Sequence, residues 1–268
     1  MELARLRLRG IYAIVAGALL LFAAPLYEAL AVGNDYSRAV AEISRSRSFL
    51  PYLTWLATHL ATDQTLRILQ VAPLLLALTL PGALARWLWP SQGAPRLIAS
   101  AAGWSGLGAF ALAGIIGLAA SARAAADFQA ASYPDARANI ALTFGQNYAL
   151  QSLLSRTFGG VALAIFLAMI SVRFLRVTRL PRWAAYLGGL VAALEAANAV
   201  FFLLNPLNIQ APTNSFSLAG LAAWLLVIGV ALWQTTNPGS GVAAVAAEKS
   251  ASTAVSPDAP SSDNGADA

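Results

Sequence analysis

The sequence contains no cysteine and a single histidine, His59. Without cysteine, the chain cannot form disulfides, hold an iron–sulfur cluster or a cysteine-ligated zinc ion, or use a thiolate in catalysis. With one histidine, it cannot hold a haem between two histidines or bind a metal through several of them. We therefore predict no cofactor and no metal site within this chain.

Charged residues are also scarce. They make up 11% of the chain, whereas soluble domains carry about a quarter. Apolar residues make up 58%, which excludes an ordinary soluble domain. Lysine is nearly absent, with Lys249 standing beside sixteen arginines. This preference, together with the abundance of alanine, is typical of a GC-rich bacterial genome, so we expect the plasma membrane of a bacterium.

Long apolar stretches fill most of the chain. About 20 apolar residues in a helix cross the hydrocarbon core of a bilayer, which is about 30 Å thick. Six stretches are long enough: Ile11–Val32, Ile68–Trp89, Leu97–Ser121, Thr157–Val177, Trp183–Asn205 and Phe216–Gln234. They predict an all-α, polytopic transmembrane helical bundle with six spans over residues 1–236. Residues 237–268 are mainly Gly, Ala, Ser, Pro and Asp, which predicts a disordered cytoplasmic tail.

The arginines indicate the orientation of the bundle. Those that flank the first span and the short loops are Arg5, Arg7, Arg9, Arg86, Arg96, Arg173, Arg176, Arg179 and Arg182. The positive-inside rule places these loops in the cytoplasm, and an even number of spans then places both termini there. One alternative stays open, because basic residues before the first span and Ala29-Leu30-Ala31 after it also fit a signal peptide. The apolar run is long for such a peptide, and its removal would leave five spans in the same orientation.

The net charge of +5 would suggest a nucleic-acid partner in a soluble protein. Here the positive charge lies beside apolar spans, where it contacts anionic lipid headgroups. No basic run is interleaved with aromatic residues, as it would be in a nucleic-acid groove. We predict the lipid bilayer as the partner of this charge and no nucleic acid.

The first outer loop, Gly33–Leu66, predicts an amphipathic helix. Its apolar side chains recur at helical spacing at Phe49, Leu53, Leu56 and Leu60. Such a helix would lie in the outer interface or cap the bundle. Asp63 is expected to cap the second span.

Prolines and small residues indicate how the helices bend and pack. Pro73 and Pro81 are expected to kink the second span. Two stripes of small residues, spaced by four, follow the fifth span: Gly188, Ala192 and Ala196, then Gly189, Ala193 and Ala197. Such stripes allow close approach of helices, and we expect packing within the bundle rather than between two copies.

Glu195 is the leading candidate for function. It lies twelve residues into the fifth span, near the middle of the bilayer, where a carboxylate costs about 2.5–3.5 kcal/mol on insertion scales. The other polar groups within or at the ends of the spans gather toward the outer side: Asn198, Glu28, Arg67, Gln70, Arg123, Gln151 and Arg156. Together they predict an outward-facing polar vestibule, with Glu195 near its floor and an apolar plug beneath it. The alternative is that they meet water or headgroups, with Glu195 hydrogen-bonded inside the bundle.

Three functions fit these residues. No motif of a water channel, an intramembrane protease or a nucleotide-binding protein is complete, so no catalytic residue is predicted. The favoured function is a non-catalytic structural, regulatory or ligand-binding membrane component, with a small molecule, a lipid or another membrane protein as its partner. The alternatives are a small proton- or cation-coupled transporter that uses Glu195, and a membrane enzyme that acts on lipid with Glu195 or Glu28 as acid or base.

Overall fold

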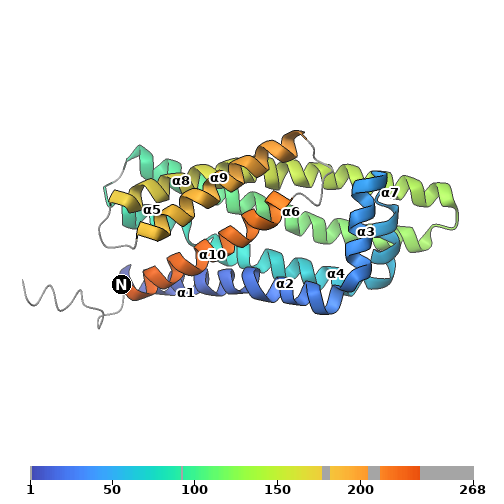
Figure 1. The fold of residues 1–268 in the computed structure, drawn as a ribbon, viewed down its shortest axis with the longest axis horizontal. Coiled ribbons are helices and arrows are strands. Elements are labelled where there is room, and N and C mark those ends of the chain that lie inside the picture. The colour runs from blue at the N-terminus through green and yellow to red at the C-terminus, as the bar shows by residue number, and fades with distance from the viewer. Residues whose placement is uncertain (1, 92, 177–181, 205–211, 236–268) are drawn as a thin grey trace, which may run out of the picture.

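The computed structural model describes residues 2–91, 93–176, 182–204 and 212–235. Within these ranges every regular element is a helix (Figure 1). Six helices are long and apolar enough to cross a membrane, which confirms the predicted all-helical, multi-pass bundle. The predicted tail at 237–268 lies outside the described residues.

The first apolar helix is interrupted by two wider π-helical segments. It consists of α1 (Glu2–Ala18), η1 (Leu19–Ala23), α2 (Ala24–Tyr27) and η2 (Glu28–Val32). Gly33 then adopts a φ of 71°, which only glycine tolerates easily, and the chain turns into α3 (Gly33–Ser46). In Figure 1, α3 stands across the long axis of the bundle.

The second helix changes direction twice. α4 (Leu50–Ala77) has a non-helical residue, His59, with φ −125° and ψ 28°. Its first part lies beside α3 and the remainder runs along the bundle. After α4 the chain leaves the helix at Leu78–Leu80, and Pro81 begins α5 (Pro81–Leu88). The predicted kink at Pro81 is therefore a break just before the proline, while Pro73 lies inside α4.

The next two helices form a long hairpin. α6 (Ala94–Ala130) is followed by α7 (Pro134–Ser152), which continues through the π-helical η3 (Leu153–Gly159) into α8 (Gly160–Arg176). The turn between α6 and α7 lies at one end of the molecule, beyond α3 (Figure 1). We name this end the cap end; it holds α3, the start of α4 and the turn of the hairpin.

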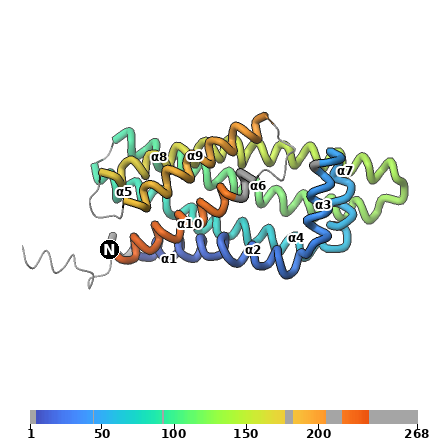
Figure 2. The backbone as a smooth tube through the Cα atoms, in the orientation of Figure 1, coloured from blue at the N-terminus to red at the C-terminus, as the bar shows by residue number. Residues whose placement is uncertain are grey.

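The last two helices are α9 (Arg182–Leu204) and α10 (Pro212–Thr235). α10 packs against both α9 and α1, and in Figure 2 it crosses obliquely from the former to the latter. The opposite end of the bundle, named the base end, holds the start of α1, α5, the end of α8, the start of α9 and the end of α10 (Figure 2).

α1 and α10 approach closely because each places glycine or alanine at the points of contact. A Cβ atom at Gly17 would lie 2.7 Å from the carbonyl oxygen of Ala222, and one at Gly229 would lie 2.7 Å from that of Gly10. Gly10 and Gly17 are seven residues apart on α1, as are Ala222 and Gly229 on α10. The two helices run in opposite directions, so these small residues meet as two successive pairs.

The small residues of α9 divide between two faces. Gly188 and Ala192 are buried, as expected for packing inside the bundle. Ala193 and Ala197 are exposed, and the described part of the chain leaves open space where Gly189 would carry a Cβ. Ala196, the third residue of the first stripe, is exposed as well. The prediction that both stripes pack internally is therefore wrong for the second stripe and for Ala196, because the rotation of the helix turns these residues outward.

A second core fills the cap end. Phe49, Leu53 and Leu56 are buried and Leu60 is half-buried, as the helical spacing predicted. They belong to the start of α4 and pack with buried residues of α6 and α7, among them Phe128 and Phe144. This part of α4 therefore covers the end of the long hairpin.

Candidate functional site

Among the described residues, polar side chains hydrogen-bond to one another at two places inside the bundle. The first is the Asp63 network, formed by Tyr52, Asp63 and Arg67 of α4. The second is the Glu195 pair, formed by Glu195 of α9 and Ser217 of α10.

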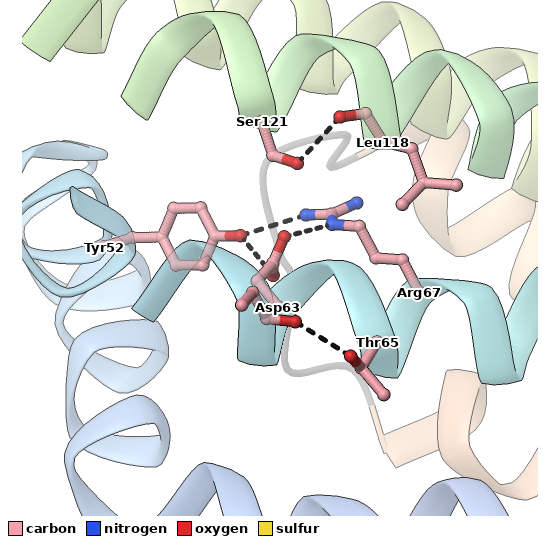
Figure 3. A network of polar contacts seen from close by, with 7 residues as sticks. Tyr52, Asp63, Thr65, Arg67, Leu118 and Ser121 are labelled. Atoms are coloured by element: carbon pink, nitrogen blue, oxygen red, sulfur yellow. Dashed lines mark hydrogen bonds and ion pairs between the residues drawn. The ribbon is translucent and has the colours of Figure 1, made fainter. Parts of the chain in front are cut away.

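The Asp63 network closes a triangle of hydrogen bonds (Figure 3). The Tyr52 hydroxyl donates to Oδ1 of Asp63 over 2.8 Å, and Nε of Arg67 donates to Oδ2 over 2.7 Å. A terminal nitrogen of Arg67 also donates to the Tyr52 hydroxyl, over 3.0 Å. Tyr52 precedes the kink at His59 and the two charged residues follow it, so the change of direction brings the phenol back onto the pair.

α6 and α7 enclose this network. A Cβ atom at Gly117 would lie 2.7 Å from Nη1 of Arg67 and 3.0 Å from Oε1 of Gln151, so the missing side chain makes room for both groups. Ser121 is buried one turn further along α6 and points toward the network in Figure 3. Its hydroxyl donates to the carbonyl oxygen of Leu118 over 3.1 Å.

The charges of this network satisfy each other. Asp63 is 2% exposed, and both of its carboxylate oxygens accept hydrogen bonds. Removing one partner of such a buried pair leaves an uncompensated charge, at a cost of about 3–5 kcal/mol. Arg67, predicted as a ligand-binding residue, is therefore occupied by bonds within the protein. Asp63 does not cap a helix as predicted, because α4 begins earlier, at Leu50.

Glu195 is less completely satisfied. Its side chain is 1% exposed, and Oε1 accepts a short hydrogen bond of 2.5 Å from the Ser217 hydroxyl. Oε2 is buried and has no hydrogen-bond partner among the described residues. A Cβ atom at Gly160 would lie 3.6 Å from Oε2, so a glycine at the start of α8 closes this side. A buried oxygen in this state is stabilised by a proton or by a donor from a ligand.

Arg156 also lies within the bundle, in η3. Its Cζ atom is 4.3 Å from the ring centroid of Phe202 and 5.8 Å from that of Tyr148, distances typical of cation–π contacts. Its Nη1 atom and the hydroxyl oxygen of Thr157 are buried without a hydrogen-bond partner in the described part of the chain. The π-helical backbone of η3 is common at functional sites.

The eight predicted site residues thus separate into groups. Arg67 and Gln151 both lie beside Gly117. Glu195, Asn198 and Arg156 lie in the interior, where Asn198 is completely buried on the same helix as Glu195. The structure does not bring the other three into either centre. The side chain of Arg123 is 87% exposed and pairs with Asp127 over 3.7 Å. Glu28 is exposed, and Gln70 is half-buried on α4.

The sequence pointed to the charged residues Arg67 and Glu195 but not to the side chains that hydrogen-bond to them. The spacing of four between Asp63 and Arg67 was a usable signal for their pairing. Tyr52 gave no such signal, because it is eleven residues from Asp63 on the other side of the kink at His59. Ser217 gave none, because it lies on a different helix from Glu195. No group of three or more His, Cys, Asp or Glu side chains within the described ranges is arranged to hold a metal ion.

Comparison of the chain with protein-family models, with curated proteins and with solved structures gives no match. The site must therefore be interpreted from its own geometry.

Proposed function

We propose that this chain is a non-catalytic, ligand-binding component of a cell membrane, that of a bacterium, and that Glu195 holds the ligand. In this proposal the base end faces the cytoplasm and the ligand enters from the cap end. The observation that carries it is the buried Oε2 atom of Glu195, which has no partner among the described residues.

The charge distribution supports this orientation. Arginines at the base end include Arg5, Arg9 and Arg86, which gather in the same place. Three arginines near the cap end have acidic neighbours on the same helix: Arg38 with Asp35, Arg45 with Glu42 and Arg123 with Asp127. The positive-inside rule counts arginines beside the spans and gives acidic residues little weight. The base end carries more of these arginines, which favours a cytoplasmic base end: Arg5, Arg7, Arg9, Arg86, Arg173, Arg176 and Arg182 lie there, against Arg38, Arg45, Arg47, Arg123 and Arg137 near the cap end.

The surroundings of Glu195 favour binding over catalysis. Its carboxylate accepts a hydrogen bond from a serine hydroxyl, which is neither an acid nor a base near neutral pH. An enzyme acting on lipid would need a second titratable group within hydrogen-bond reach of the carboxylate. An amine or hydroxyl group of a ligand could instead donate the hydrogen bond that Oε2 lacks.

A proton- or cation-coupled transporter is the second candidate, and the same unpartnered oxygen favours it. A transporter also needs a path from Glu195 to the cytoplasm. Toward the base end, α8 and α10 present an apolar core that includes Ile170, Phe174 and Leu232, each no more than 2% exposed. This core supports binding from one side rather than passage through the bundle.

Native mass spectrometry of the detergent-purified protein tests the proposal. We expect a defined small mass on the wild type that disappears from Glu195→Gln, an isosteric change that removes the acceptor charge. Asp127→Asn is the matched control because its acid lies on the surface, and it should retain the mass. No retained mass on the wild type, or equal retention by Glu195→Gln, would contradict the proposal.

A transport assay separates the second candidate. The purified protein would be reconstituted in liposomes that contain a pH-sensitive dye, with a proton gradient applied. We expect equal leak from wild type and Glu195→Gln. Uptake that requires Glu195 would support the transporter instead.

A further inference from the structure

Two adjoining cavities open at the base end, between α1 and the region where α4 breaks before α5. Their volumes are about 310 and 220 Å³. Both are lined by Arg5 and Arg9 of α1 and by Arg86 of α5. We name the two cavities together the arginine cleft.

The arginine cleft concentrates positive charge. Arg9 experiences the charges of both Arg5 and Arg86, which repel its own. No acidic side chain lines either cavity in the described part of the chain. Three guanidinium groups in this arrangement are stabilised by an anion, and a guanidinium matches the oxygens of a phosphate group particularly well.

Arg86 is held in place within the cleft. Its Nε atom donates to the carbonyl oxygen of Gly82 over 3.1 Å. This bond uses the inner nitrogen, so the donors of the two terminal nitrogens are available to a phosphate. Fixing the side chain in advance lowers the entropy lost when a ligand binds.

One wall of the cleft is aromatic and apolar. Trp104 of α6 donates from Nε1 to the carbonyl oxygen of Leu78 over 3.1 Å. Its ring rests on Gly82, where a Cβ atom would lie 2.6 Å from Cζ2. The break after α4 therefore receives the indole, and Tyr12 lines the same cavity.

The cleft is also open sideways. Leu8 and Trp104, which line it, are 48% and 49% exposed. In a bundle with six membrane-crossing helices, apolar side chains on this surface contact lipid. The cleft therefore combines three arginines with an adjoining apolar surface that faces lipid. This combination fits a molecule that has both a phosphate group and an acyl chain.

We propose that the arginine cleft binds an anionic phospholipid, with its phosphate between Arg5, Arg9 and Arg86 and an acyl chain along Leu8 and Trp104. This site is distinct from Glu195 and does not depend on the function proposed for it. A water-soluble phosphate ester shares the headgroup chemistry but would leave the apolar wall unused. The two sources are therefore separable by experiment.

Binding would be measured by native mass spectrometry of the full chain in detergent, titrated with phosphatidylglycerol, phosphatidylcholine or glycerol 3-phosphate. We expect phosphatidylglycerol to bind at least tenfold more tightly than phosphatidylcholine, and glycerol 3-phosphate to bind too weakly to be retained. Equal binding of the two lipids would overturn the proposal. Retention of glycerol 3-phosphate as tight as that of phosphatidylglycerol would overturn the assignment to a lipid.

Variants locate the site. Arg9→Gln and Arg86→Gln should each weaken phosphatidylglycerol binding about fivefold, the effect of about one arginine near an anionic surface. Arg7→Gln is the matched control, because Arg7 lies on α1 at the same end, is exposed and lines neither cavity. An equal loss in Arg7→Gln would show that only diffuse charge matters and would overturn the proposal. If Arg86→Gln does not fold, Arg86→Lys replaces it as a variant that keeps the positive charge. The comparison of phosphatidylglycerol with phosphatidylcholine on the wild type then still tests the proposal.

Discussion

The close contact of α1 with α10 gives a sharp prediction for Gly17→Ala. The new Cβ would lie 2.7 Å from the Ala222 carbonyl oxygen and 2.8 Å from the Leu226 nitrogen. A carbon and a carbonyl oxygen prefer about 3.3 Å or more, so the helices would have to separate locally by about 0.6 Å. Since both contacts are backbone atoms, no side-chain rotation relieves them. Such overpacking costs about 1–3 kcal/mol.

Gly108→Ala is the matched control. Gly108 also lies within a helix, and the described part of the chain leaves open space where its Cβ would stand. Both substitutions gain the same helix propensity of about 1 kcal/mol. The difference between the two variants therefore isolates the cost of the contact, and we expect Gly17→Ala to be less stable than Gly108→Ala by about 1–3 kcal/mol.

Unfolding in mixed micelles by titration with SDS would measure this difference, with the fluorescence of the seven tryptophans as the signal. Gly10→Ala should fall between the other two variants, because its nearest contact, the Gly229 carbonyl oxygen, is 2.9 Å away. Equal stability of Gly17→Ala and Gly108→Ala would refute the close approach of the two helices.

Three further predictions concern the Asp63 network. Asp63→Ala leaves the Arg67 guanidinium, whose side chain is only 23% exposed, without its partner, and should lower the free energy of unfolding by about 3–5 kcal/mol in the same SDS titration. Arg123→Ala removes an exposed pair and should change that free energy by less than about 1 kcal/mol. Tyr52→Phe removes one donated and one accepted hydrogen bond, so a thermal-unfolding assay should show a loss of about 1–3 kcal/mol; unchanged stability would mean that the phenol is dispensable. Gly117→Ala would place a methyl group 2.7 Å from Nη1 of Arg67 and should destabilise the wild type. It should not destabilise the Asp63→Ala variant, in which the guanidinium is free to move. A double-mutant cycle of the two substitutions measures this coupling.

The membrane architecture could be predicted from the sequence because it depends on local composition. Apolar runs of sufficient length specify membrane-crossing helices wherever they occur, and all six were found. The apolar spacing from Phe49 to Leu56 likewise specified a buried helical face. Pro81 specified a helix break because proline cannot donate the required hydrogen bond.

The contacts between helices could not be predicted in the same way. Ser217 donates to Glu195 from 22 residues along the chain, and nothing in either segment indicates that their helices adjoin. Gly10 and Gly17 are seven residues apart, and the same spacing occurs on α10, but neither pattern identifies its partner helix. The pairing of Tyr52 with Asp63 depends on the non-helical conformation of His59, which no proline or glycine marks.

The long hairpin of α6 and α7 has one more consequence. At 1.5 Å per residue, the 37 residues of α6 extend about 55 Å, whereas the hydrocarbon core measures about 30 Å. The turn that contains Tyr133, which is 75% exposed, should therefore stand in water beyond the headgroups. Since the chain has no cysteine, Tyr133→Cys would supply a unique thiol there, and a reagent that cannot cross membranes would report directly which compartment the hairpin enters.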